Sequence, residues 1–314
     1  MHERDFISWI RRQEQLDPKA FPLGPGDDCA IAKLGGEDLL VTCDQVLDGV
    51  HFRLAEHGAE AVGRKAMARA LSDVAAMAAV PVAAVATVAL PRGFTRQDAE
   101  ALYRGRRSVS DVTNCPVIGG DLGVWDGPLA ISMTVFARRA GVTGGVEPVL
   151  RSGARPGQAV CLTGRLGGSW RGRRHLEFLP RLAEGVALAM NYRVRAMIDI
   201  SDGLATDLRH LCEASGLGAE IVAADVPIHN DARIGLNPAD SAAALRRALT
   251  DGEDYELLFT LPSAWARKLV ERQPLPVPVT RVGRIVKARG ITLIHPDGRR
   301  EELADAGWEH RTDG

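Results

Sequence analysis

The sequence of 314 residues lacks several features that would place it in common protein classes. It has only five cysteines, widely scattered and without a C-x-x-C pair, so neither a disulfide framework nor a zinc ribbon is expected. No basic-then-apolar segment stands at its N-terminus, and its most apolar stretch, Val74–Leu90, is short for a membrane span and contains Pro81. Lys+Arg (39) and Asp+Glu (40) nearly cancel, which argues against a bulk electrostatic binder of nucleic acid or membrane. We therefore expect a cytoplasmic protein.

The common phosphate-binding and hydrolytic motifs are also missing. There is no G-x-x-x-x-G-K-[ST] loop, no protein-kinase motif set, no G-x-S-x-G and no H-E-x-x-H. The glycine-rich segment Gly164–Ser169 does not match G-x-G-x-x-G, and we interpret it as an ordinary loop.

The length is typical of two domains, and helical and strand-like segments alternate as in α/β proteins. A turn-rich segment near residue 150 separates the halves, which predicts domains at 1–145 and 146–314. We expect Pro81 to break the chain between a helix and a strand. The predicted helices are Phe6–Arg12, Ala59–Ala79, Arg96–Asp111 (with Thr95 as N-cap), Leu182–Met190, Leu204–Ala214, Ala242–Leu249 and Ala264–Arg272. The predicted strands are Leu39–Cys43, Val82–Leu90, Val117–Ile118, Leu129–Ala137, Ala159–Leu162, Ala219–Val222, Glu256–Leu261 and Ile291–His295.

Acidic residues recur in six short motifs beside glycine or other small residues. Each motif alone is typical of a turn or a helix cap. Asp44, Asp121 and Asp199, however, each follow a strand-like run, which predicts that they lie along one edge of a sheet. Converging carboxylates repel by about 4 kcal/mol per pair at 4 Å with an effective dielectric near 20. Such a site needs divalent cations, and oxygen ligands favour Mg²⁺ and phosphoryl transfer.

One predicted helix carries three charged residues at i, i+4 and i+8: Lys65, Arg69 and Asp73. A solvated ion-pair stripe is the alternative, but the apolar sequence around Asp73 favours a role in a metal or active site. On another helix, we expect Asp207 to be a solvated or helix-start acid. Trp308 is expected either to anchor the polar C-terminal tail or to stack on an aromatic ligand.

Together the motifs resemble the thiamine-monophosphate kinase family of the PurM-like superfamily, which includes aminoimidazole-ribonucleotide synthetase. They occur in the family's order along essentially the whole chain. The motifs are Gly24–Ile31, Asp44 with Asp48–Phe52, Leu71–Met77, Gly119–Asp121, Asp199–Leu204 and Asp251–Leu257.

This resemblance implies a two-domain α/β fold of the PurM-like type, whose N-terminal domains bind ATP and Mg²⁺ and pair in a homodimer. It implies the ATP-dependent phosphorylation of thiamine monophosphate to thiamine diphosphate by direct in-line transfer, with several Mg²⁺ ions and no dedicated catalytic base. Carried over by position, the metal ligands are Asp28, Thr42, Asp44, Asp73, Asp121, Asp199 and Asp202. The implied ATP contacts are Gly120, Asp121, Arg151, Ser201 and Tyr103, and the implied substrate contacts are His51, Glu253 and Trp308.

Two departures from the family pattern stand out. Cys43 occupies a position where the family has threonine, and Leu122 and Gly123 replace a pair of threonines. Two alternatives therefore stay open at this point. One is another PurM-like ATP-dependent enzyme, such as aminoimidazole-ribonucleotide synthetase or the hydrogenase-maturation type. The other is a catalytically silent nucleotide-binding dimer.

Overall fold

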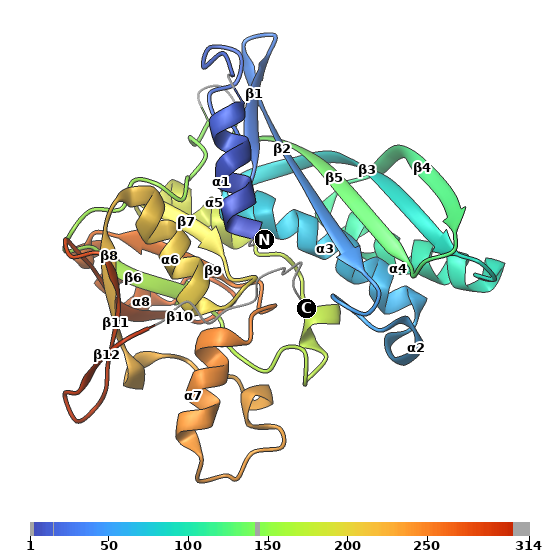
Figure 1. The fold of residues 1–314 in the computed structure, drawn as a ribbon. Coiled ribbons are helices and arrows are strands. Elements are labelled where there is room, and N and C mark those ends of the chain that lie inside the picture. The colour runs from blue at the N-terminus through green and yellow to red at the C-terminus, as the bar shows by residue number, and fades with distance from the viewer. Residues whose placement is uncertain (1–2, 15, 142–144, 304–314) are drawn as a thin grey trace.

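The computed structural model describes residues 3–14, 16–141 and 145–303, which form two mixed α/β halves, each built on its own sheet (Figure 1). The first half, blue to green in Figure 1, contains α1 (Glu3–Gln13), β1 (Ala30–Leu34), β2 (Glu37–Leu47), α2 (Leu54–His57), α3 (Ala59–Ala76), β3 (Ala79–Pro91), α4 (Arg96–Thr113), β4 (Val117–Trp125) and β5 (Ala130–Arg139). Its five-stranded sheet has the order β1-β2-β5-β3-β4. All neighbouring strands are antiparallel except β3 and β4, which are parallel and joined by α4.

The second half forms a seven-stranded sheet with the order β12-β11-β8-β10-β6-β9-β7. Its strands are β6 (Ala159–Thr163), β7 (Ala196–Asp199), β8 (Gly218–Val222), β9 (Leu257–Leu261), β10 (Val279–Val286), β11 (Gly290–Ile294) and β12 (Arg300–Glu302). Its α-helices are α5 (Leu182–Asn191), α6 (Leu204–Ser215), α7 (Ser241–Thr250) and α8 (Ser263–Arg272). Short 3₁₀ turns lie at Arg174–Leu176, Ala223–Asp225 and Asn230–Arg233.

Two glycines let α3 and α4 pack closely. A Cβ atom on Gly63 would lie 2.0 Å from the carbonyl oxygen of Leu102, and one on Gly105 would lie 1.7 Å from that of Glu60. Any larger residue at either position would push the helices apart. The Thr95 side chain accepts a hydrogen bond from a backbone N–H at the start of α4, which confirms the predicted N-cap.

Helix α3 belongs to both hydrophobic cores. Its central residues Met67 and Leu71 pack under the first sheet. Its last residues, Ala75 and Ala76, share a core cluster with residues of the second sheet such as Phe259. Helix α3 therefore connects the two halves, and charged residues on its remaining face lie between them.

The structure confirms the mixed α/β class and the type of each predicted element, with differences at the boundaries. The expected break at Pro81 is wrong, because β3 begins at Ala79 and runs through this proline. A register shift between Pro81 and Ala83 accommodates the missing N–H group. Strand β4 extends well past the predicted Ile118, so Asp121 lies inside a strand.

Candidate active site

Three buried or partly buried carboxylates lie close together between the two halves. Asp28 precedes β1, Asp73 lies on α3, and Asp199 ends β7. One carboxylate oxygen of each lies within 4.8 Å of the others, close enough to hold one cation. Thr42, on β2, donates a hydrogen bond to Asp73, and Asp44 lies two residues further along the same face of that strand. Five predicted metal ligands therefore converge, and we call Asp28, Thr42, Asp44, Asp73 and Asp199 the acidic cluster.

Burial and mutual repulsion dominate the electrostatics of this cluster. Burial, followed by the charges of Asp44, Asp199 and Asp28, raises the pKa of Asp73 well above its ordinary value. Burial and then the charge of Asp28 raise the pKa of Asp199 to about 7. The Oδ2 atom of Asp28 is buried and has no hydrogen-bond partner among the described residues. A buried acceptor without a donor, within an all-oxygen set, fits a hard divalent cation such as Mg²⁺.

Basic and hydroxyl side chains hold the carboxylates in place. Arg69 Nε donates to Asp44 Oδ2 over 2.8 Å, and Arg151 Nη2 donates to Asp28 Oδ1 over 2.6 Å. Ser72 Oγ donates to Asp199 Oδ2 over 2.7 Å. The solvated-stripe alternative for α3 is therefore wrong, because its charged face points at partners from both halves.

The prediction that Asp44, Asp121 and Asp199 line one edge of a sheet is wrong. Asp199 belongs to the second sheet, whereas Asp44 and Asp121 lie within strands of the first. β2 and β4 are three strand spacings apart, about 14 Å at 4.8 Å each. In the strand register Asp121 shares a row with Gln45, so it points to the opposite face of the sheet from Asp44. Within one chain Asp121 does not join the acidic cluster.

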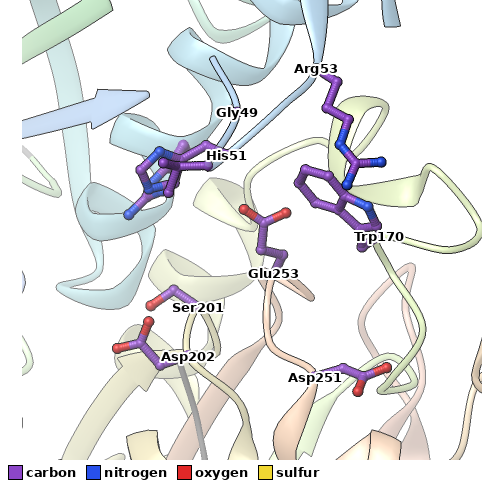
Figure 2. Close-up of a pocket in the computed structure, with 10 residues that line it drawn as sticks. Gly49, His51, Arg53, Trp170, Ser201, Asp202, Asp251 and Glu253 are labelled. Atoms are coloured by element: carbon purple, nitrogen blue, oxygen red, sulfur yellow. The ribbon is translucent and has the colours of Figure 1, made fainter. Parts of the chain in front are cut away.

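A cavity of about 310 Å³ adjoins the acidic cluster (Figure 2). Arg69 connects the two, because its side chain lines the cavity while its Nε binds Asp44. Four predicted site residues line the cavity: His51, Ser201, Asp202 and Glu253. It is also lined by Gly49, Val50, Arg53, Trp170 and Asp251, which are not among the predicted site residues.

Glu253 takes part in a buried polar group with Lys65 and His175. Lys65 is fully buried, and its Nζ lies 2.7 Å from both Glu253 carboxylate oxygens and 2.8 Å from His175 Nδ1. Burial alone would raise the pKa of Glu253, but the hydrogen bond with His175 and the charge of Lys65 lower it to about 2. Burial lowers the pKa of Lys65 to about 8, so both groups are charged at neutral pH. The negative charge that Glu253 brings to the cavity is thus matched by Lys65.

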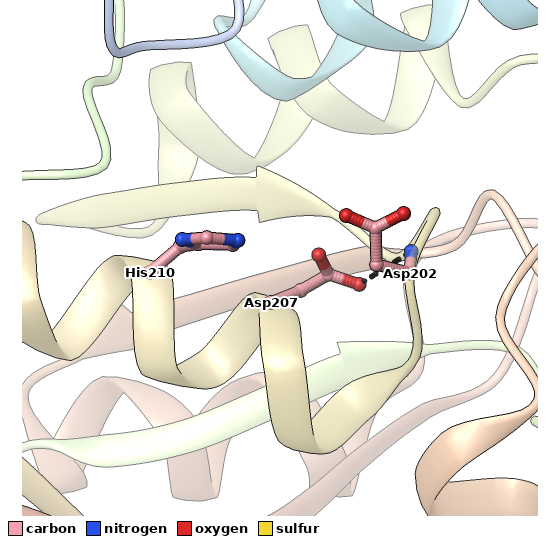
Figure 3. A group of neighbouring side chains, drawn as sticks. All are labelled: Asp202, Asp207 and His210. Carbon is pink, nitrogen blue, oxygen red and sulfur yellow. Dashed lines mark hydrogen bonds between the residues drawn. The ribbon is translucent and has the colours of Figure 1, made fainter. Parts of the chain in front are cut away.

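A second group of possible ligands lies at the start of α6 (Figure 3). Asp202, Asp207 and His210 each offer one atom within 4.8 Å of the others, and Asp207 accepts a hydrogen bond from the Asp202 N–H. Asp207 does lie in the first turn of a helix, but the expectation that it is solvated is wrong, because its side chain is buried. Asp202 therefore belongs to this second group and to the lining of the cavity.

The other predicted residues have distinct surroundings. His51 is buried, and its Nδ1 accepts a hydrogen bond from the Leu47 N–H, so the ring also stabilises its own turn. Tyr103 is half-exposed on α4, beside Arg106. Gly120 lies on β4, where a Cβ atom would come within 1.9 Å of the Ala86 carbonyl oxygen. Trp308 lies outside the described residues.

Comparison with known proteins identifies the family. Residues 26–138 match the family model "AIR synthase related protein, N-terminal domain", and residues 155–296 match the corresponding C-terminal domain. The thiamine-monophosphate kinase of Rhodopirellula baltica is 37% identical over 98% of this chain and 97% of its own length. The chain belongs to the thiamine-monophosphate kinase family.

Further members of this family match the chain equally completely. The thiamine-monophosphate kinase of Bacillus subtilis is 30% identical over 99% of both chains. The solved structure "AaThiL complexed with AMPPCP and TMP" gives a TM-score of 0.82 at 28% identity, covering 99% of this chain and 97% of that one. The predicted family and fold class are thereby confirmed.

The structure shows where the chain departs from the family's sequence pattern. Cys43 alternates with Thr42 and Asp44 on β2, so its exposed side chain points away from the acidic cluster. Leu122 and Gly123 lie on the exposed strand β4. Neither departure removes a group from the acidic cluster.

Among the described residues, no helix is both long enough and apolar enough to cross a membrane.

Proposed function

We propose that this chain transfers the γ-phosphoryl group of ATP directly to the phosphate of thiamine monophosphate. The observation that carries the proposal is the acidic cluster beside a cavity lined by His51 and Glu253, with Arg69 connecting the two. Full-length relatives that bear the name thiamine-monophosphate kinase, and a solved relative described as holding AMPPCP and TMP, support the choice of substrates.

In the proposed reaction an oxygen of the substrate phosphate attacks the γ-phosphorus of ATP. One P–O bond forms to thiamine monophosphate, the P–O bond to the β-phosphate breaks, and ADP leaves with the bonding electron pair. The attacking oxygen is already anionic at neutral pH, so no general base is needed. The main barrier is the repulsion between two polyanions.

The acidic cluster would hold Mg²⁺ through Asp28, Thr42, Asp44, Asp73 and Asp199, and Asp202 would supply a further ligand near the cavity. When bound, Mg²⁺ offsets the phosphate charges and aligns the attacking and leaving oxygens. Arg69 and Arg151 keep two of these carboxylates oriented through their ion pairs. Ser201, which lines the cavity beside Asp202, would contact the nucleotide together with Arg151.

The position of Asp121 leads us to propose a homodimer that completes the nucleotide site. Strand β4 is the edge of its sheet and exposes Ile118, Leu122 and Val124 by 60% or more. An apolar, unpaired edge strand is a pairing surface. A second copy that pairs along this edge would bring its own Gly120 and Asp121, together with its Tyr103 from α4, toward the ATP bound by the first copy.

We also propose the domain division 1–145 and 146–314, because each sheet falls wholly within one of these ranges. The N-terminal domain would then supply ATP and Mg²⁺ binding and dimerisation. A cytoplasmic location is supported by the five cysteines, all of them free.

The test is product formation by the purified chain with ATP, Mg²⁺ and either thiamine monophosphate or free thiamine. The monophosphate should yield thiamine diphosphate, and free thiamine should yield none. Asp44→Asn and Asp73→Asn should each lose most of kcat, whereas the matched control Asp297→Asn, at an exposed turn, should keep it. A wild-type chain that leaves thiamine monophosphate unchanged would refute the proposed function.

A further inference from the structure

Trp170 lines the cavity, although no sequence motif pointed to it. It lies in the loop that follows β6, directly after Ser169. Figure 2 shows its indole on one side of Glu253, with Ser201 and Asp202 on the other side. The cavity therefore has an aromatic end and, next to the acidic cluster, a polar end.

Neighbouring rings hold the indole of Trp170 in one orientation. The His175 ring stacks on it, with centroids 4.6 Å apart and an interplanar angle of 19°. The His57 ring contacts it edge-on at 5.6 Å, and Lys65 Nζ lies 5.4 Å from the ring centroid. Because these contacts already fix the side chain, a ligand that stacks on the indole loses little binding energy to ordering it.

We propose that Trp170 binds the aromatic ring system of thiamine monophosphate, a flat heteroaromatic group that carries a positive charge. This inference rests on the proposed function, which supplies the substrate. Among the described residues that line the cavity, Trp170 is the only Phe, Tyr or Trp. Indole is the best of these side chains for stacking on a cationic ring. With the rings at Trp170, the substrate phosphate extends past Glu253 toward Ser201 and Asp202.

The same end of the cavity carries an acidic group that favours a cation. Asp251 lines it, and its Oδ2 accepts a hydrogen bond from the Gly168 N–H over 3.2 Å. Glu253 is neutralised by its ion pair with Lys65, whereas Asp251 forms no ion pair with any described residue. Asp251 therefore offers an acidic group to a positively charged ring at Trp170, although Arg171 and Arg247 lie near it and Arg53 lines the same cavity.

The experiment compares Trp170→Ala and Trp170→Phe with wild type. The matched control is Trp265→Phe, an indole on α8 that packs against Tyr192 away from the cavity. Trp170→Ala should raise the KM for thiamine monophosphate about tenfold and change the KM for ATP by less than about twofold. Trp170→Phe should show a smaller rise. Thiamine monophosphate alone should quench the tryptophan fluorescence of wild type and of Trp265→Phe, but that of Trp170→Phe much less.

Three results would overturn the inference while leaving the proposed function intact. The first is an active Trp170→Ala variant with an unchanged KM for thiamine monophosphate. The second is an equal rise in both KM values with a lower melting temperature, which would mean that the indole only anchors its loop. The third is a quench that persists in Trp170→Phe and disappears in Trp308→Phe, which would assign the stacking to Trp308. Loss of the proposed function itself would instead appear as a wild-type enzyme without turnover.

Discussion

Replacing Asp199 by asparagine removes one charge from the acidic cluster and keeps the shape of the side chain. The Ser72 hydroxyl that donates to Asp199 Oδ2 can donate to the asparagine carbonyl oxygen as well. Burial and the charge of Asp28 raise the Asp199 pKa from 3.8 to about 7. At 1.36 kcal/mol per pH unit, ionising Asp199 in the folded, metal-free chain lowers the free energy of unfolding by at most about 4 kcal/mol.

The direction of the Asp199 pKa shift decides whether rising pH stabilises or destabilises the metal-free wild type. The unfolded chain releases the Asp199 proton near pH 4, whereas the folded chain without metal holds it until about pH 7. Between these values the folded state binds more protons, so the stability of the metal-free wild type falls as pH rises. The asparagine side chain of the variant does not titrate, so the variant escapes this loss.

Thermal unfolding in EDTA at pH 4 and pH 8 measures the effect. At pH 8 the Asp199→Asn variant should be more stable by about 2–4 kcal/mol, a rise of roughly 3–6 °C in Tm for a chain of 314 residues. At pH 4 the two proteins should melt together. Saturating Mg²⁺ at pH 8 should reverse the order, because metal binding stabilises only the complete ligand set. Two results would refute this reasoning. One is a variant that melts at a lower temperature than wild type at pH 8 in EDTA. The other is a difference in Tm between variant and wild type that is the same at both pH values.

Three further predictions concern single contacts. Glu253→Ala should lower the free energy of unfolding by about 3–5 kcal/mol, because it leaves the fully buried Lys65 without its carboxylate partner. Adding Lys65→Met should recover part of the loss, and denaturant titration of both variants checks this. Tyr255→Phe should keep or raise stability, by up to about 3 kcal/mol, since the Tyr255 hydroxyl is buried without a hydrogen-bond partner among the described residues; a clear fall in Tm would show that the hydroxyl has one. Leu122→Arg on β4 should shift the sedimentation coefficient toward that of a monomer and lower turnover, and a variant that stays dimeric would place the interface elsewhere.

Local patterns in the sequence predicted the elements well. The capping residue Thr95 located the start of α4, and Asp73 on α3, which the sequence favoured for a metal or active site, lies beside Asp28 and Asp199. Boundaries failed where tertiary contacts override propensity, as in β3, whose pairing with β5 continues through Pro81. Strand β10 was missed because arginines and Gly283 interrupt its apolar pattern.

The sequence indicated which residues form the candidate site, but not how the fold brings them together. The motifs identified Asp28, Asp73 and Asp199, yet only the fold shows that they meet between two sheets. The side of the sheet on which Asp121 lies depends on strand register, which the sequence does not reveal. The ion pair of Lys65 with Glu253 joins residues 188 positions apart, and only the three-dimensional fold brings them together.

The proposed direct transfer from ATP to thiamine monophosphate is tested most directly by tracing where the new phosphoryl group comes from. The chain should be incubated with thiamine monophosphate, Mg²⁺ and ATP carrying ³²P at either the γ- or the β-position. Direct transfer predicts that the γ-label enters thiamine diphosphate in step with ADP release, that the β-label stays in ADP, and that Asp73→Asn transfers almost none. Transfer of the β-label to the product, or formation of thiamine diphosphate without γ-label, would contradict the account.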